Sequence, residues 1–129
     1  MRPLFLYGTL RPGSWNHDRW MAPFLAATCR PGRVAGMALH HVDGLPYLVP
    51  SPGSVVLGDL ADLDPARYDA TLELLDEFEG THAGHYRRVV LTTEAGEEAW
   101  AWLAGDDLTA SVDDTTVVAS GDWLDVRSR

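Results

Sequence analysis

Residues 4–13 read LFLYGTLRPG, and this stretch decides how the start of the chain folds. The apolar and aromatic run at its beginning is typical of a short buried strand, which we expect over residues 3–7. Gly8 then interrupts the run, and a Pro-Gly pair closes the stretch with a turn signal. A loop of this kind, at the end of a strand, can hold an anion or a developing oxyanion with its backbone amides. The candidate binding residues of this loop are Tyr7, Gly8, Thr9 and Leu10.

Two phosphate-binding motifs do not fit this loop. Gly8 and Gly13 have the spacing of a phosphate loop, but Ser14 follows where that motif requires Lys, and the chain contains no Lys. The G-x-G-x-x-G pattern of dinucleotide-binding folds is missing as well. An ordinary strand end followed by a turn is the alternative interpretation of the loop.

Composition and charge restrict the function classes. At 129 residues, with 46% hydrophobic and 22% charged residues, the chain is expected to form a single globular domain over residues 1–129. The formal net charge of −9 argues against binding to a nucleic-acid backbone or to an anionic membrane. No apolar run approaches the ~20 residues of a membrane helix, and no leader-like segment precedes the first strand, so we expect a cytoplasmic protein. Cys29 is the single cysteine and is expected to be a small apolar filler.

Beyond the first loop, short strand patterns alternate with turn signals. We expect strands over residues 33–42, 45–49, 55–60, 86–93, 98–103 and 116–119, and turns at 30–32, 43–44 and 51–53. Gly36 and Gly58 suggest bulges within their strands, and Asn16 is a candidate N-cap of a short helix. Several short strands around one longer helix predict an α+β fold, in which a small, strongly curved mixed sheet carries packed helices.

The longer helix is predicted over residues 65–78. Asp64-Pro65 supplies an N-cap followed by proline at the first helical position, and Gly80 lies past the end. At about 100° per residue, Tyr68, Leu72 and Leu75 form one apolar stripe. The acids expected on the solvent side are Asp69, Glu73, Asp76 and Glu77.

Glu79 is the exception among these acids, since it falls near ~20° from Tyr68, within the apolar stripe. Burial first, and the nearby acids second, should raise the pKa of its carboxyl. A raised pKa suits a general acid/base near neutral pH. Two structural alternatives stay open: fraying at the helix end, and a salt bridge to Arg87 or Arg88.

Three blocks of sequence carry a family resemblance. They read YGTLR at 7–11 with NH at 16–17, LDEFEG at 75–80 with YRR at 86–88, and GDW at 121–123. In this order, and across nearly the whole chain, they resemble the γ-glutamylcyclotransferase-like (AIG2-like) family. The resemblance implies a compact β-barrel-like core with peripheral helices, and it places the family's catalytic glutamate at Glu79.

The resemblance also implies a reaction. The α-amine of a γ-glutamyl amide attacks its own γ-carbonyl, closes a ring, and releases 5-oxoproline and a free amine. Glu79 would be the general acid/base, and the loop amides would hold the α-carboxylate or the oxyanion. The small-molecule γ-glutamyl amide would be the only partner, and no cofactor is required. The sequence specifies neither the released amine nor the oligomeric state.

Several other residues have two interpretations each. Tyr86 could hydrogen-bond a substrate or orient Glu79, or be a half-buried strand aromatic, and Tyr7 could line the site or only anchor its strand. His82 and His85 have H-x-x-H spacing, but Gly84 makes a helix there improbable, so we expect no metal site. Three alternative functions remain: a non-catalytic binding module for a small carboxylate or amide, an enzyme that removes a γ-glutamyl protecting group, and a protein-interaction domain.

Overall fold

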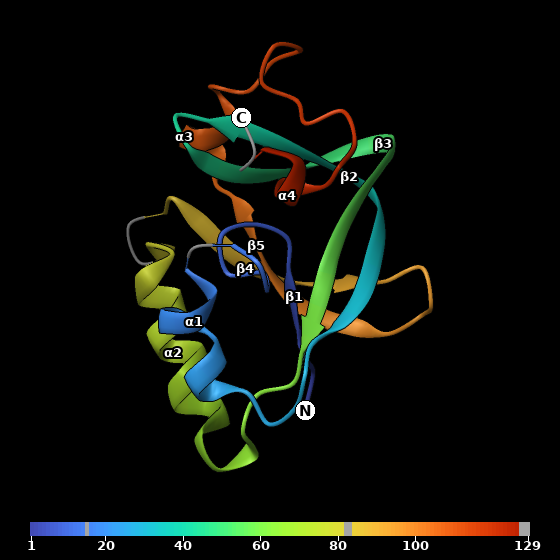
Figure 1. The fold of residues 1–129 in the computed structure, drawn as a ribbon. Coiled ribbons are helices and arrows are strands. Elements are labelled where there is room, and N and C mark those ends of the chain that lie inside the picture. Colours follow the sequence, from blue (N-terminus) through green and yellow to red (C-terminus); the bar gives the residue numbers. More distant parts are fainter. Residues whose placement is uncertain (15, 82–83, 127–129) are drawn as a thin grey trace.

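The computed structural model describes residues 1–14, 16–81 and 84–126. In chain order, the elements are β1 (Leu4–Leu6), α1 (His17–Trp20), the 3-10 turn η1 (Ala22–Phe24), β2 (Arg30–Val42), β3 (Leu45–Ala61), the 3-10 turn η2 (Pro65–Arg67), α2 (Tyr68–Phe78), β4 (Tyr86–Thr92), β5 (Glu98–Ala104), α3 (Asp106–Thr109) and α4 (Trp123–Val126). The fold is α+β, as the sequence predicts (Figure 1).

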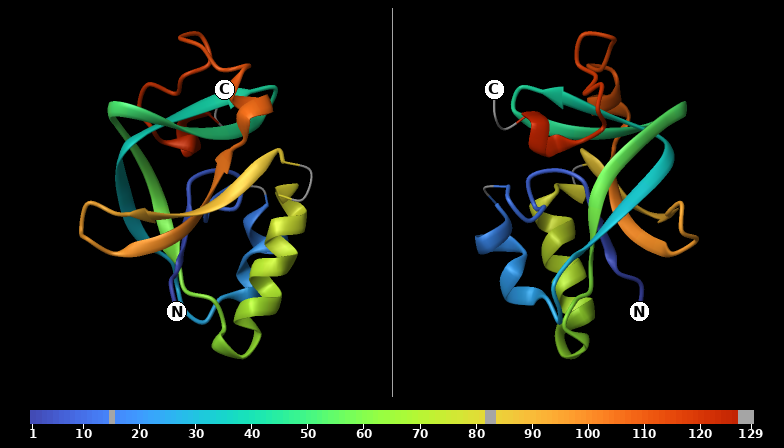
Figure 2. Two further views of the ribbon diagram at one scale, coloured as in Figure 1. Left: turned by 180° about the vertical axis from the view of Figure 1, so that it is seen from behind. Right: turned by 45° about the vertical axis from the view of Figure 1, so that its right-hand side comes forward.

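The five strands form one sheet in the order β2-β3-β1-β5-β4. The short β1 lies in the middle, antiparallel to β3 and parallel to β5. Two hairpins, β2–β3 and β4–β5, therefore flank the first strand, and they diverge from it in Figure 2. Within the described residues β2 and β4 are not joined, so the sheet is open and "barrel-like" describes it too strongly.

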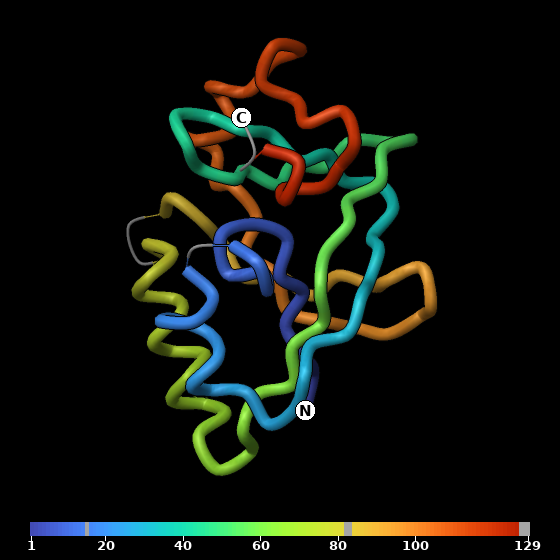
Figure 3. Tube along the Cα trace, in the orientation of Figure 1, coloured from blue at the N-terminus to red at the C-terminus, as the bar shows by residue number. Residues whose placement is uncertain are grey.

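The β2–β3 hairpin is longer than the sequence suggested. Residues 30–32 belong to β2 rather than to a turn, and the two strands predicted over 45–49 and 55–60 are one strand, β3. The register jumps from Ala35–Val55 to Met37–Pro50, so residues 51–54 stand opposite Gly36 alone. The signal at 51–53 thus marks a bulge, with Gly53 at φ 85°, and not a strand end. Beyond it, the hairpin bends across the top of the molecule (Figure 3).

The helix predicted over 65–78 begins as the 3-10 turn η2, continues as α2 from Tyr68, and ends as predicted. The Asp64 carboxylate accepts a hydrogen bond from the Ala66 amide at 3.0 Å, which satisfies a free donor at the start. Gly80, at φ 72°, takes the left-handed conformation that ends the helix. Leu72 and Leu75 are buried beneath the helix, and α1 lies beside α2 (Figures 1 and 2).

Alternate residues of β1 face two apolar clusters. Leu4 and Leu6 belong to the cluster under α1 and α2, whereas Phe5 belongs to the one that Trp123 and Val126 of α4 close. The strand predicted over 116–119 reduces to a single bridge between His40 and Val117. No helix among the described residues is long and apolar enough to cross a membrane.

Candidate active site

A cavity of about 370 Å³ opens where β1 ends, between the loop that follows it, the β3 end of the hairpin turn and the facing ends of α1 and α2. Its volume lies in the range of small-molecule sites. Every candidate residue of the sequence lines it: Tyr7, Gly8, Thr9, Leu10, Glu79 and Tyr86. The other lining residues are Phe5, Leu6, Asn16, Trp20, Leu45, Pro46, Phe78 and Trp102. Segments more than sixty residues apart in sequence therefore meet at one site.

Among the described residues of the cavity wall, Glu79 has the one ionisable carboxyl. It caps the C-terminus of α2 with helical backbone angles, which keeps its side chain on the inward stripe. Among the described residues its carboxyl has no hydrogen bond or ion pair. Burial raises the pKa of Glu79 to about 7, because few polar groups replace the lost water. The expectation of a raised pKa agrees with this, but its second cause, the neighbouring acids, makes no contribution.

Among the described residues, Glu79 forms a salt bridge with neither Arg87 nor Arg88, the alternative that the sequence left open. Arg88 instead donates to Asp76 at 3.0 Å, and the indole of Trp102 donates to the same carboxylate at 2.9 Å. Asp76 was expected on the solvent side, and this was wrong, since its side chain is 16% exposed. These partners on β4 and β5 draw Asp76 inward, and Asp76 takes the Arg88 guanidinium that could have paired with Glu79.

The loop after β1 presents unpaired backbone donors. Within the described parts of the chain, the N–H groups of Gly8, Thr9 and Leu10 donate to no acceptor. The loop is held from behind, because the Asn16 side-chain amide donates to the Thr9 hydroxyl at 3.2 Å and its backbone N–H to the Thr9 carbonyl. Asn16 occupies the predicted N-cap position of α1, but its side chain makes no capping hydrogen bond there. Its side chain supports the loop instead.

Both candidate tyrosines donate their hydroxyl protons to backbone carbonyls. Tyr7 donates to the Trp102 carbonyl, and Tyr86 to the Pro46 carbonyl at 2.9 Å. Burial, with Glu79 second, raises the pKa of both phenols. The phenols stay neutral, and their oxygens are left with lone pairs that can only accept.

The β3 end of the hairpin turn packs directly on the loop. A Cβ on Gly8 would lie 2.5 Å from Cγ of Pro46, so only glycine fits this close approach. Leu45 and Pro46 thus become one wall of the cavity, and Trp20 with Phe78 forms another, their rings 5.0 Å apart. We predicted no functional role for these wall residues from the sequence.

The third sequence block ties the loop to the sheet. Arg11 is buried, and its guanidinium donates to Asp59 at 2.8 Å and to Asp122 at 2.7 Å. Gly121 sits against β3, with a Leu57 amide bonded to its carbonyl at 2.9 Å. Trp123 is buried in the core. The block therefore supports the site from outside the cavity.

The arrangement suits proton transfer beside a bound anion. A carboxyl with a pKa near 7 faces a loop of free amides, and two acceptor oxygens lie in the same wall.

Two of the histidines are hydrogen-bonded to neighbouring side chains. His40 is bonded to Thr116, and His85 is bonded to Asp107. His82 lies outside the described residues. The described part of the chain contains no cluster of three or more metal-ligating side chains.

Comparisons with known proteins identify the family of the chain. The family model described as gamma-glutamyl cyclotransferase, AIG2-like, matches residues 4–125. The MJ1514 protein of Methanocaldococcus jannaschii, whose name also places it with the γ-glutamylcyclotransferases, is 30% identical over 98% of this chain and 99% of its own. The gamma-glutamylaminecyclotransferase of Rattus norvegicus is 31% identical over 96% of this chain and 84% of its own.

Among solved structures, the uncharacterized protein PH0828 of Pyrococcus horikoshii superposes with a TM-score of 0.72. It is 26% identical, and the match covers 99% of this chain and 94% of that one. The family model spans nearly the whole chain, including the loop after β1, Glu79 and the C-terminal block. The chain therefore belongs to the AIG2-like γ-glutamyl cyclotransferase family.

Proposed function

We propose that this protein converts a γ-glutamyl amide into 5-oxoproline and a free amine. The substrate's α-amine nitrogen forms a bond to its own γ-carbonyl carbon, and the bond from that carbon to the amide nitrogen breaks. The nucleophile is already part of the substrate, so holding the glutamyl chain folded supplies much of the rate enhancement. The proposed reaction requires no cofactor.

Glu79 performs both proton transfers. As a carboxylate it accepts a proton from the α-ammonium, which frees the lone pair for attack. As the resulting acid it donates that proton to the leaving nitrogen when the tetrahedral intermediate collapses. A pKa of about 7 means that neither form is strongly favoured near neutral pH, which suits a group that must do both.

The loop and the tyrosines orient the substrate. The free amides of Gly8, Thr9 and Leu10 bind the α-carboxylate or the developing oxyanion. The phenol oxygens of Tyr7 and Tyr86 accept from the α-ammonium, since their own protons are committed to carbonyls. The two charged ends of the glutamyl group then find complementary partners in the lining of the same cavity.

One observation carries this proposal: a single cavity holds an unpaired, proton-exchanging carboxyl and a loop of unpaired amides. Membership of the family supports the reaction class. A structural acid would be expected to pair with Arg88, yet that guanidinium is bonded to Asp76.

A substrate screen tests the proposal. The purified protein is incubated with a series of γ-glutamyl amides, and 5-oxoproline and the freed amine are measured together. We expect the two products in equal amounts. N-acetyl-γ-glutamyl amides serve as the matched control, because their blocked nitrogen cannot attack. Binding without turnover for every amide would instead indicate a binding module, and release of glutamate would indicate hydrolysis.

A further inference from the structure

The mouth of the cavity is apolar and exposed. Leu45 is 48% exposed and Phe78 is 38% exposed, although both line the cavity, and Trp20 is partly exposed beside them. Residues that face both the cavity and solvent lie at its entrance. By contrast, the lining residues of β1, β4 and β5 are buried. Three large apolar side chains therefore surround the entrance, and they come from three different elements, α1, α2 and the start of β3.

The proposed chemistry directs the leaving group to this entrance. In the proposed complex, the α-carboxylate of the substrate binds the loop amides. Its α-ammonium binds the phenol oxygens of the two tyrosines and the Glu79 carboxylate. The leaving nitrogen must also reach the Glu79 carboxyl, to receive its proton. Phe78 precedes Glu79 on α2 and stacks with Trp20 at 5.0 Å. A substituent on that nitrogen then extends between these rings and Leu45.

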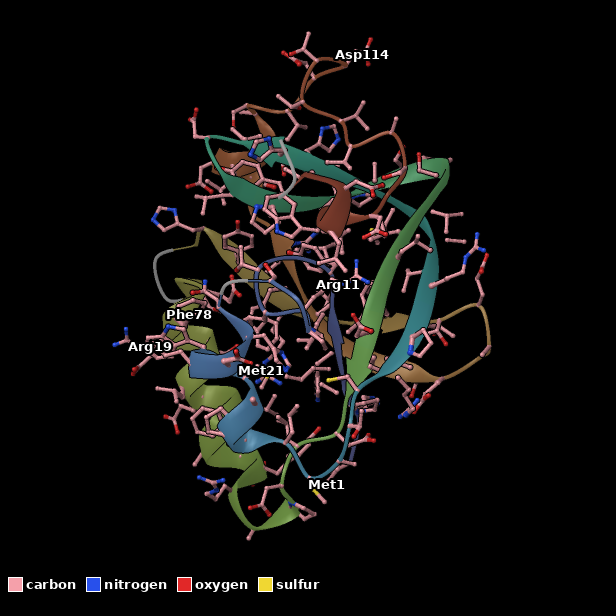
Figure 4. All side chains as sticks on the ribbon, viewed as in Figure 1. Met1, Arg11, Arg19, Met21, Phe78 and Asp114 are labelled. Carbon is pink, nitrogen blue, oxygen red and sulfur yellow. The ribbon has the colours of Figure 1, made fainter. Side chains whose placement is uncertain are left out.

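The lack of charged side chains in the entrance lining disfavours an ionic substituent. Apart from Glu79, no described lining residue carries a charge. A second carboxylate would lose water against apolar surface, and the exposed Arg19 guanidinium near Trp20 offers it only a water-screened attraction. A second ammonium would approach the Arg19 guanidinium, which lies 5.5 Å from the Trp20 ring centre. Figure 4 shows Arg19 and Phe78 on this same side of the molecule.

We propose that the entrance formed by Trp20, Leu45 and Phe78 selects γ-glutamyl amides of uncharged apolar amines, alkyl or arylalkyl. This inference rests on the proposed function, and it names the class of the released amine. An alkyl or aromatic substituent loses its hydration here and gains contact with three side chains. A charged substituent must also give up the water around its charge, which costs free energy.

Two matched substrate pairs test the selection. γ-Glutamyl-phenethylamide and γ-glutamyl-phenylalanine differ only in a carboxylate, and γ-glutamyl-n-butylamide and γ-glutamyl-4-aminobutylamide differ only in a terminal amine. We expect kcat/KM for 5-oxoproline release to be at least about tenfold higher for the uncharged member of each pair. Equal or greater kcat/KM for either charged member would overturn the inference while leaving the proposed function intact.

Two variants on α2 connect the selection to the entrance. Phe78→Ser removes an entrance residue, and Leu74→Ser is the control, because Leu74 is 37% exposed on the same helix and lies outside the cavity. We expect the apolar preference to fall several-fold in Phe78→Ser and to persist in Leu74→Ser. An unchanged preference in both variants, or a loss in both, would overturn the assignment to the entrance. If no substrate releases 5-oxoproline, the proposed function fails, and this inference fails with it.

Discussion

Glu79 differs from the other acids of α2 in what surrounds it. It lies among apolar and phenolic groups, and the Arg88 guanidinium is bonded to Asp76 instead. Burial then acts without compensation and raises the pKa of the carboxyl to about 7. The result is a proton-exchanging group whose behaviour depends on pH in two measurable ways.

The first consequence concerns activity. If Glu79 must begin as a carboxylate, kcat/KM should rise with pH through about 7 and level off above it. The profile of 5-oxoproline release between pH 5 and 9 measures this. A rate that is independent of pH across that range would contradict a titrating base in the free enzyme.

The second consequence concerns stability. Glu79 is favoured in its neutral form in the folded protein, with a pKa of about 7 against 4.5 in the unfolded chain. Its stabilising contribution is therefore full below about pH 4.5, and it is lost as the pH rises through about 7. Glu79→Gln removes this dependence, so the variant should gain about 3 kcal/mol relative to wild type between pH 4 and 8. Urea unfolding at several pH values measures the difference, with the exposed Glu77→Gln as control. Parallel curves for Glu79→Gln and wild type would contradict the raised pKa.

The sequence predicted the directions of some side chains of α2 and not of others. The inward direction of Glu79 followed from helical periodicity and from a good N-cap, both of which are local. Asp76 was misplaced because its partners, Arg88 and Trp102, lie 12 and 26 residues away in sequence. Periodicity gives the face of a helix, but it does not reveal a cation that a neighbouring strand brings to that face.

Among the elements, the loop after β1 depends on an ion-pair network that joins three distant segments. Arg11 is the shared partner, and the carboxylates come from β3 and from the segment before α4. Side-chain exposure is 9% for Arg11, 17% for Asp59 and 25% for Asp122. Removing the cation would leave two half-buried carboxylates facing each other.

We therefore expect Arg11→Met to destabilise the protein by about 3–5 kcal/mol, the usual effect of breaking a buried pair. Asp114→Asn is the control, since Asp114 is exposed at the far end of the molecule from the site (Figure 4), and it should change stability by less than about 0.5 kcal/mol. Denaturant unfolding measures both. A loss below about 1 kcal/mol for Arg11→Met would show that the network is not a support of the loop.

The elements themselves were predicted unevenly, for a physical reason. The helix and the β4–β5 hairpin have strong local signals. The structure has the two strands within a residue of their predicted bounds and ends α2 at the predicted residue, but the first three residues predicted as helix form the 3-10 turn η2. The β2–β3 hairpin was divided at 51–53, because proline and glycine mark a turn and a bulge alike. Pairing with β2 keeps β3 continuous there, and that pairing is non-local information.

For the whole molecule, the cavity exists because the bent hairpin, the loop after β1 and two helices converge on one place. Its apolar entrance could not be predicted, since Trp20, Leu45 and Phe78 meet only in the folded chain. The polar interior could be predicted, because the loop and Glu79 each carry their own sequence signal. The family blocks contain these two and not the entrance residues Trp20 and Leu45.

Such a cavity couples ligand binding to global stability. A γ-glutamyl amide that binds the folded protein alone should stabilise it by about 2.7 kcal/mol at a hundredfold excess over Kd. We expect γ-glutamyl-n-butylamide to raise the Tm of Glu79→Gln by several degrees, because this variant binds without turnover. n-Butylamine at the same concentration is the control, and it should have little effect. If the amide leaves Tm unchanged, the loop amides do not bind the glutamyl group.

We assign Glu79 the role of general acid/base in a γ-glutamyl cyclotransferase reaction. This role is tested most directly by measuring 5-oxoproline release by wild type, Glu79→Gln and Glu77→Gln on one active γ-glutamyl amide. Gln keeps the size of Glu79 but cannot exchange a proton, so we expect kcat to fall by about 10²–10⁴-fold or more. Glu77 is exposed and lies outside the cavity, so Glu77→Gln should retain nearly full activity. Wild-type turnover by Glu79→Gln, or an equal loss in both variants, would contradict the assignment.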